Sequence, residues 1–286
     1  MDSESGSIIL LRTKLHRPPV THNHVHRSKL LERLDKSRHK SVNLISAPAG
    51  YGKSMLVSRW LEVCKIPGAW LSIDQDDNDL RRFLSYFIAA IQTIHPHAAC
   101  KTQTLIDSTL LPPQDVLVTT LVNELDLIDT DFNIVLDDIH HIHDKIVHDF
   151  LNRVLRYPPR YMHLILVGRR DPLIAVATLR ARGKLAELRM RDLRFSMDES
   201  IIFLQAATAH EIEPTTIAAL AKKTEGWVTG LHLVALAMQG QKNPARKLLK
   251  LEGTTHYLVE YLINEVLDHQ PVDIRDIFRT GTSHSR

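Results

Sequence analysis

Cysteine is scarce in this sequence of 286 residues, because only Cys64 and Cys100 are present. They form neither a disulfide framework nor a metal-binding pattern, which favours a reducing, cytoplasmic environment. Long apolar runs are missing as well, since none approaches the ~18 residues that cross a membrane. The apolar segment 8–11 is too short for a secretory signal and has no basic region before it. We therefore expect a cytoplasmic protein.

A large excess of one charge is also missing. Lys and Arg number 36 and Asp and Glu number 33, which gives a formal net charge of +3. This excess is too small to indicate a nucleic-acid-binding protein. Apolar residues make up 44% of the chain and charged residues 24%, proportions typical of a globular protein with one large domain or two smaller ones.

The most informative stretch is the segment 41–55. Residues 42–45 predict a short buried strand, and apolar residues at helical spacing follow Ser54. Between them, Pro48 and two glycines cannot continue the strand. A strand, a loop of small residues, Lys-Ser and a helix are typical of a phosphate-binding loop. In such a loop, backbone N–H groups and the helix N-terminus hold the anion.

This loop departs from the motif G-x-x-x-x-G-K-[ST] at one position, where Ala47 replaces the first glycine. Lys53 is predicted to reach the β- and γ-phosphates of a nucleotide, and the Ser54 hydroxyl is predicted to bind Mg²⁺. The alternative is an ordinary strand–turn–helix with an exposed lysine. The predicted nucleotide-binding residues of the loop are Ala47, Pro48, Ala49, Gly50, Tyr51, Gly52, Lys53, Ser54 and Met55.

A second motif occupies residues 132–139. Residues 134–136 predict a buried parallel strand that ends in Asp137 and Asp138. A strand that ends in acid, after a phosphate-binding loop, is typical of a Walker B site. Asp137 would hold Mg²⁺, directly or through water, and Asp138 would orient or deprotonate the attacking water. The alternative is a strand followed by an Asp-rich cap of the next helix.

Two further groups follow predicted strands. His140, His141 and His143 do not converge on one metal ion without other ligands, so a local structural or phosphate-sensing role is favoured over a metal site. Arg169 follows the apolar segment 163–167, at the C-terminal edge of a predicted strand. An arginine there is well placed to contact a γ-phosphate, and a basic surface turn is the alternative.

The pattern of apolar residues changes near residue 196. Before it, strands alternate with helices, which predicts an α/β fold with a parallel sheet. Within this part we expect an irregular segment at 95–113 and a solvated acidic turn at 74–79 that caps the next helix. After it, only helices are predicted. The expected divisions are an N-terminal arm (1–27), a P-loop nucleotide-binding domain (28–195), a small all-helical domain (196–278) and a disordered tail (279–286).

Five segments, in matching order and spacing, resemble the MalT-like STAND signal-transduction ATPases. These proteins are large bacterial transcriptional regulators of the LuxR type. Alanine at position 47 is usual in that family, and the resemblance covers about residues 10–278. The five segments are residues 45–54, 69–78, 136–140, 179–188 and 226–231.

The resemblance implies a signal-transduction switch that binds ATP or ADP with Mg²⁺, hydrolyses ATP slowly or conditionally, and self-associates in its ATP state. It implies a parallel sheet in strand order 2-3-1-4-5, followed by a helical domain that closes over the nucleotide. Arg169 would be the sensor arginine and, with Asp138, a catalytic residue. Val25, His26 and Arg27 would lie along the adenine, and the loop 226–231 would approach the nucleotide.

Members of this family continue into a winged helix, a helical sensor array and a DNA-binding helix-turn-helix, whereas this sequence stops at Arg286. We therefore expect the sensor and DNA-binding parts to be absent and the chain alone not to bind DNA specifically. A fragment, a truncated product and a short paralogue all fit. The alternative function is a stand-alone P-loop enzyme such as a small-molecule kinase, and a third is a degenerate scaffold that binds no nucleotide.

Overall fold

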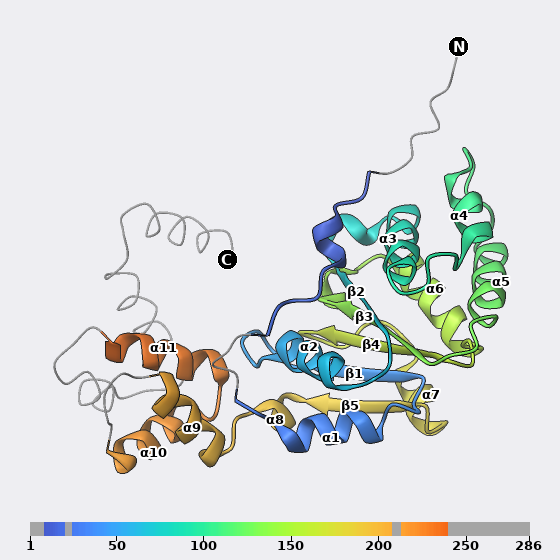
Figure 1. Cartoon of the computed structure of the whole chain (residues 1–286). Helices are drawn as coiled ribbons and strands as arrows, with labels where there is room; N and C mark the ends of the chain where they lie inside the picture. Colours follow the sequence, from blue (N-terminus) through green and yellow to red (C-terminus); the bar gives the residue numbers. More distant parts are fainter. Residues whose placement is uncertain (1–8, 21–24, 208–212, 240–286) are drawn as a thin grey trace, which may run out of the picture. The chain divides into compact units, whose positions relative to one another are not determined.

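The computed structural model describes residues 9–20, 25–207 and 213–239 (Figure 1). The helices predicted at 257–267 and 273–278, and the tail at 279–286, lie outside these residues. The chain divides into two compact units. The first takes in residues 1–20, 28–49 and 53–192, and the second takes in residues 21–27, 50–52 and 193–286.

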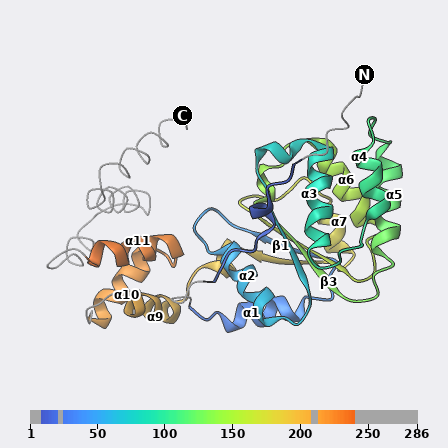
Figure 2. The ribbon, with the colours of Figure 1, turned by 45° about the horizontal axis from the view of Figure 1, so that its top comes forward.

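A parallel sheet forms the centre of the first unit (Figure 2). Every residue of its three central strands is buried, as expected for a parallel sheet with helices on both faces. The predicted α/β fold is therefore confirmed. The strands are β1 (Val42–Ser46), β2 (Gly68–Ser72), β3 (Phe132–Asp137), β4 (Met162–Gly168) and β5 (Leu185–Arg189).

The strand order differs from the expected one. It is β2-β3-β4-β1-β5, so the order 2-3-1-4-5 was wrong about the position of β4. A single helix, α6 (Lys145–Arg156), connects β3 to β4 and places Phe132 opposite Met162. Strand β1 then pairs with β4 on one side and β5 on the other. Because β1 and β4 are both buried along their whole length, their periodicity could not show which of them lies beside β3.

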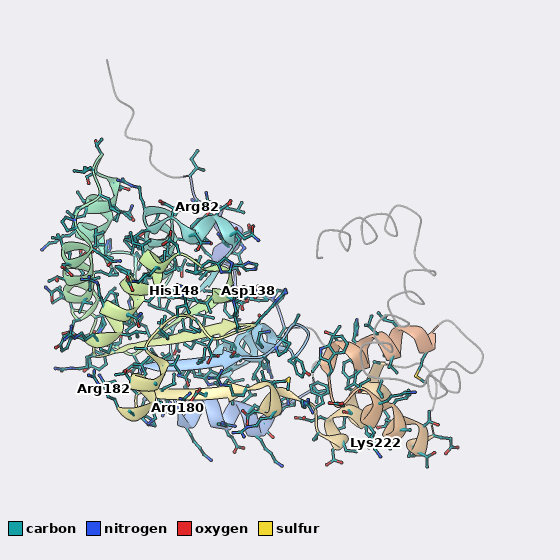
Figure 3. The ribbon with its side chains drawn as sticks, turned by 180° about the vertical axis from the view of Figure 1, so that it is seen from behind. Arg82, Asp138, His148, Arg180, Arg182 and Lys222 are labelled. Carbon is teal, nitrogen blue, oxygen red and sulfur yellow. The ribbon has the colours of Figure 1, made fainter. Side chains whose placement is uncertain are left out.

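Helices cover both faces of this sheet, with α2 (Lys53–Val63) on one face and α6 and α7 (Val176–Ala181) on the other (Figures 1 and 3). This division follows from right-handed crossovers that run in opposite directions along the sheet. None of the described helices is long and apolar enough to cross a membrane. The remaining described helices of this unit are α1 (Ser28–Lys36), α3 (Leu80–Gln92), α4 (Cys100–Asp107), α5 (Gln114–Leu125) and α8 (Met190–Leu193), with 3-10 turns at Arg12–Leu15, Gln75–Asn78 and Ile139–His141.

Helix α4 lies where an irregular segment was expected, so that prediction was wrong. The side chain of Glu124, on α5, accepts hydrogen bonds from the N–H groups of Lys101 and Thr102 at 2.7 and 2.9 Å, and from the Thr102 hydroxyl at 2.6 Å. These N–H groups belong to the first turn of α4, where backbone N–H groups have no acceptor within the helix. The cap comes from a residue distant in sequence, so the local pattern did not reveal it.

The described part of the second unit is helical, with α9 (Met197–Ala207), α10 (Pro214–Lys223) and α11 (Val228–Gln239). These helices bury a core of their own, separate from that of the sheet. Pro214 occupies the first position of α10, where its missing N–H leaves no hydrogen bond unmade. The core residues are Leu204, Ile217, Leu220, Leu231, Val234, Ala235 and Met238.

Candidate functional site

The predicted phosphate-binding loop leaves the carboxyl end of β1. The N–H of Ala47 donates to the carbonyl of Gly168 at 3.2 Å, so the loop begins beside the end of β4. Gly50 and Gly52 have φ angles of 79° and 71°, a left-handed conformation that side chains with a Cβ rarely adopt. Helix α2 begins directly afterwards at Lys53. The sequence therefore folds locally as the motif predicts, with a helix N-terminus at the end of a small-residue loop.

The two predicted motifs meet through one hydrogen bond. The Ser54 hydroxyl, in the first turn of α2, donates to Oδ1 of Asp137 at the end of β3, at 2.8 Å. Lys53 is only 7% exposed, and its ammonium donates to the carbonyl of Pro48 at 3.0 Å. The hydroxyl and ammonium of two adjacent residues therefore gather with a carboxylate from a distant part of the sequence at one end of the sheet.

Burial governs the electrostatics of this site. Burial, and next the charge of Asp138, raise the pKa of Asp137 to about 6. Burial also lowers the pKa of Lys53, while the carboxylates of Asp138 and Asp137 act in the opposite direction. Both shifts express the cost of removing charged groups from water. A ligand that carries both negative charge and a metal ion would offset these costs.

Replacement of Asp137 by asparagine is expected to stabilise the protein in the absence of nucleotide and Mg²⁺. The pKa of Asp137 rises from 3.8 to about 6 on folding, so the folded state binds a proton more tightly than the unfolded state. The stability from this proton is complete below the unfolded pKa and is lost as the pH rises through the folded pKa. A shift of about two units corresponds to about 3 kcal/mol.

Thermal melting followed by circular dichroism tests this prediction. At pH 7.5 Asp137→Asn should melt several degrees above the parent, and near pH 4 the two should melt together. Asp129→Asn, at an exposed position of the same unit, is the matched control and should not change the melting temperature. A lower melting temperature for Asp137→Asn at pH 7.5 would contradict the prediction.

Asp138 has an unusual backbone conformation, with φ 57° and ψ 34°. This left-handed conformation is uncommon outside glycine, although aspartate tolerates it better than most residues, and such strain gathers at functional sites. Its carboxylate is 46% exposed and lies 3.5 Å from Nδ1 of His140. Burial, and next the neighbouring His141, lower the pKa of His140 to about 4. His140 is therefore neutral at physiological pH.

The two arginines after β4 lie differently. Arg169 is exposed and directly follows β4, and its charge is the smallest of the contributions to the lowered pKa of Lys53. Arg170 donates to the carbonyl of His140 at 3.3 Å and lies 2.8 Å from Nδ1 of His143. Arg170 thus connects the end of β4 to the histidine segment. Sequence reasoning overlooked it, although the Arg-Arg pair at the strand end was a signal.

Mg²⁺ is the metal that fits the donors present. Among the described residues, no three His, Cys, Asp or Glu side chains form a group that could hold a metal ion. Ser54 and Asp137 offer a hydroxyl and a carboxylate oxygen, hydrogen-bonded to each other at 2.8 Å. Mg²⁺ takes few protein ligands and completes its octahedron with water and phosphate oxygens. The pair therefore suits a magnesium ion that arrives with a nucleotide.

The residues predicted to lie along the adenine belong to the second unit. Arg27 is buried; it donates to the carbonyls of Leu193 and Arg194 at 2.8 and 2.9 Å and pairs with Glu199 at 3.2 Å. Val25 is buried and His26 is exposed. Arg27 therefore anchors its segment to the start of the helical bundle.

Within the same unit, Gly50 contacts the segment 226–231. The expectation of a loop there was wrong for residues 228–231, which form the first turn of α11. The N–H and the hydroxyl of Thr229 both donate to the carbonyl of Gly50, at 3.0 and 3.2 Å. A Cβ at Gly50 would lie 2.4 Å from Oγ1 of Thr229, so this contact also requires glycine. Met55, the last predicted loop residue, is half-buried in α2.

Sequence comparison places these motifs in a known context, although no family model matches the chain. The chain is 34% identical over 262 residues to the HTH-type transcriptional regulator MalT of Yersinia pestis (strain Pestoides F), and 33% identical over 269 residues to MalT of Serratia proteamaculans (strain 568). These matches cover 91% and 93% of this chain. The predicted resemblance to the MalT-like regulators is confirmed. The MalT-like chain spans 29% and 30% of the length of these relatives.

Two solved structures share the fold of this chain. A Signal Transduction ATPase with Numerous Domains (STAND) protein with a tetratricopeptide repeat sensor, from Pyrococcus horikoshii, matches with a TM-score of 0.60 and 16% identity, over 89% of this chain and 34% of that one. A Walker-type ATPase of Pyrococcus abyssi matches with a TM-score of 0.56 and 15% identity, over 90% of this chain and 79% of that one. At these identities the likeness shows the fold, that of a P-loop ATPase.

Proposed function

We propose that this chain is the ATP/ADP-binding switch module of a bacterial transcriptional regulator similar to MalT, and that it hydrolyses ATP slowly or conditionally. The hydrogen bond between Ser54 and Asp137 carries the proposal, because it joins the phosphate-binding loop to the acidic strand end. Similarity to the MalT regulators supports a regulatory role. By the same similarity we propose that the ATP state self-associates and that the module lies in the cytoplasm.

Each residue of the site has a proposed part in binding. The backbone of residues 47–52 and the N-terminus of α2 would surround the phosphates, which suit the positive end of a helix. Lys53 would bring a full positive charge to the β- and γ-phosphates. Ser54 and Asp137 would hold Mg²⁺, which would neutralise phosphate charge. Val25, His26 and Arg27 would shape the adenine subsite through their fixed place at the start of the bundle.

Asp138 and Arg169 have the proposed catalytic parts. Asp138, half-exposed just after β3 and outside the Ser54–Asp137 hydrogen bond, would orient or deprotonate the attacking water. Arg169, exposed at the end of β4, would stabilise charge on the transferred phosphoryl group. Positioning and charge stabilisation are the main tasks of a protein in phosphoryl transfer.

Equilibrium dialysis tests the binding proposal. We expect ATP and ADP to bind in the presence of Mg²⁺ and GTP to bind more weakly, because the sequence contains no Asn-Lys-x-Asp segment to recognise guanine. Tighter binding of GTP than of ATP would assign another class of P-loop protein. Failure of all three nucleotides to bind would leave a degenerate scaffold.

Asparagine substitutions at the two aspartates should separate binding from hydrolysis. We expect Asp138→Asn to keep its affinity for Mg²⁺-ATP and to lose hydrolysis by roughly a hundredfold or more, the usual range for a general base. Asp137→Asn should instead weaken Mg²⁺-dependent binding. Dialysis and phosphate release measured on the same samples compare the two variants, each of which is a control for the other. Equal loss of binding in both would contradict the assignment.

A further inference from the structure

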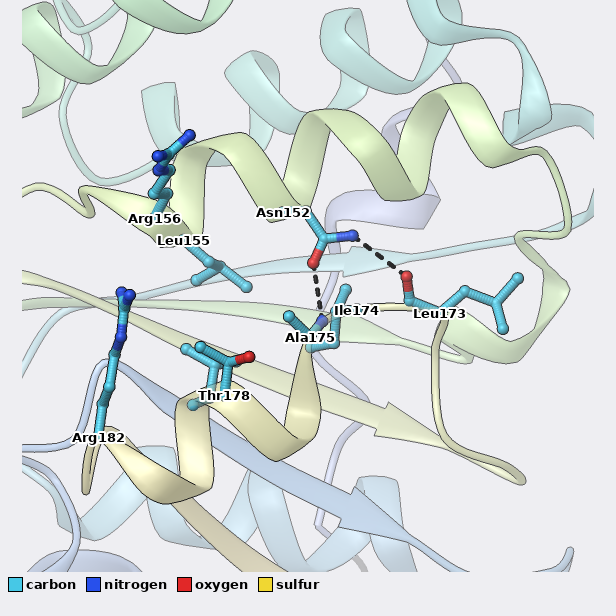
Figure 4. Close-up of a pocket in the computed structure, with 9 residues that line it drawn as sticks. Asn152, Leu155, Arg156, Leu173, Ile174, Ala175, Thr178 and Arg182 are labelled. Carbon is cyan, nitrogen blue, oxygen red and sulfur yellow. Dashed lines mark hydrogen bonds between the residues drawn. The ribbon is translucent and has the colours of Figure 1, made fainter.

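The first unit has a pocket of about 600 Å³ between α6 and α7 (Figure 4). Its floor is apolar and nearly buried, with Leu155, Ile174 and Leu179 below 9% exposure. Leu173 lies at the rim and is 68% exposed. A pocket of this size and lining lies within the ~300–1,000 Å³ range of small-molecule sites. It contains none of the predicted nucleotide-binding residues.

One side of the pocket is held in shape by Asn152 on α6. Its side-chain amide donates to the carbonyl of Leu173 at 3.2 Å, and its side-chain oxygen accepts from the N–H of Ala175 at 2.8 Å. These two bonds, drawn in Figure 4, tie the segment before α7 to α6. Because both ends of its amide are hydrogen-bonded in this way, Asn152 holds the pocket wall in place. A charged ligand would therefore have to be bound by other side chains of the lining.

Positive charge comes from two arginines at one end of the pocket, Arg156 and Arg182 (Figure 4). Both are exposed, and in the part of the chain that the structure describes neither has a carboxylate within ion-pair distance. The neighbouring Arg180 is different, since it pairs with Glu187 at 2.8 Å. Arg156 lies 5.6 Å from the centre of the Tyr157 ring, a contact that leaves its N–H donors available to an anion. Two such guanidinium groups beside an apolar floor favour a ligand with an anionic head and an apolar body.

We propose that this pocket binds a small amphipathic organic anion. The apolar body of the ligand would cover Leu155, Ile174 and Leu173, and its carboxylate, sulfonate or phosphate would pair with Arg156 and Arg182. The Thr178 hydroxyl, on the exposed side of α7 and within the lining, is available for a further hydrogen bond. This site is independent of the proposed nucleotide site.

Two fluorescent probes of similar shape test the proposal on the full chain. 8-Anilinonaphthalene-1-sulfonate has a sulfonate, and N-phenyl-1-naphthylamine lacks one. The double variant Arg156→Gln/Arg182→Gln should bind the sulfonate at least tenfold more weakly and the neutral probe within twofold of the parent. Thr178→Trp, which fills the pocket, should weaken the binding of both probes at least tenfold. Arg59→Gln, on α2 at the opposite face of the sheet, is the matched control and should change neither.

Competition and melting complete the experiment. Saturating Mg²⁺-ATP should not displace the sulfonate probe, and displacement would place that probe in the nucleotide site and overturn the proposal. Parent-like binding in both Thr178→Trp and the double arginine variant would also overturn it. Since arginines at helix ends also stabilise helices, melting accompanies each titration. If the double variant is unfolded, Leu173→Glu at the exposed rim replaces it, and this variant should weaken binding of the sulfonate probe more than binding of the neutral probe. An equal loss of affinity for the two probes would overturn the proposal.

Discussion

Replacement of Lys53 by alanine is expected to weaken ATP binding roughly ten- to hundredfold. Lys53 is the only lysine in the loop, and residues 47–52 provide backbone donors but no full positive charge. A charge-assisted contact to phosphate in a partly desolvated site contributes ~1.5–3 kcal/mol, which corresponds to that rise in the dissociation constant. Equilibrium dialysis with Mg²⁺-ATP measures the effect.

The fold of Lys53→Ala should survive. Among the residues that the structure describes, the Lys53 ammonium hydrogen-bonds to the Pro48 carbonyl, and burial lowers its pKa, so its charge is disfavoured there. The melting temperature should therefore stay level or rise. Lys65→Ala removes an exposed lysine just beyond α2 and should leave both affinity and melting unchanged. Parent-like ATP affinity in Lys53→Ala would refute the phosphate-binding loop and the function proposed from it.

Local patterns predicted much of the sheet domain, because its elements carry strong local signals. The apolar strands at 42–46, 132–137 and 162–168 and the loop glycines at 50 and 52 follow from residue types alone. The sequence also indicated that Ser54 and Asp137 serve one site, and the structure brings them to 2.8 Å. Parallel strands align their carboxyl ends, so motifs at two strand ends can be expected to meet.

Features that depend on distant partners were not predictable in the same way. The backbone conformation of Asp138 and the anchoring of Arg27 to Leu193 and Glu199 depend on tertiary contacts. The acidic segment 74–79 is the clearest example. Asp79 caps α3 as expected, by accepting from the N–H of Arg82. Asp77, however, is completely buried and not solvated, because a lysine from the N-terminal arm pairs with it.

That lysine, Lys14, provides the prediction with the largest effect on stability. Lys14 is 7% exposed and Asp77 is 0% exposed. The Lys14 ammonium pairs with Asp77, lies 3.0 Å from Asp74, and sits 4.4 Å from the centre of the Tyr86 ring. Lys14→Ala would leave the buried carboxylate of Asp77 with its longer ion pair, to Arg82 at 3.6 Å, and without its main partner. Loss of one partner from a buried ion pair costs ~3–5 kcal/mol. The melting temperature should fall by about 10 °C.

The position of Asp77 allows the cause of this loss to be isolated. Asp77→Asn in the Lys14→Ala background removes the buried charge that has lost its lysine, and the double variant should therefore recover part of the lost stability. Arg38→Ala is the control for an exposed pair, because Arg38 and Asp35 lie 3.8 Å apart and are each more than half exposed. Such pairs contribute ~0–1 kcal/mol.

Urea unfolding at pH 7.5 measures the free energy of unfolding of each variant and ranks them. A change for Lys14→Ala no larger than that for Arg38→Ala would show that the arm contributes little to stability. A double variant less stable than Lys14→Ala alone would show that the carboxylate of Asp77 mainly serves its other contacts, the hydrogen bond from the N–H of Asp74 at 2.9 Å and the pair with Arg82 at 3.6 Å.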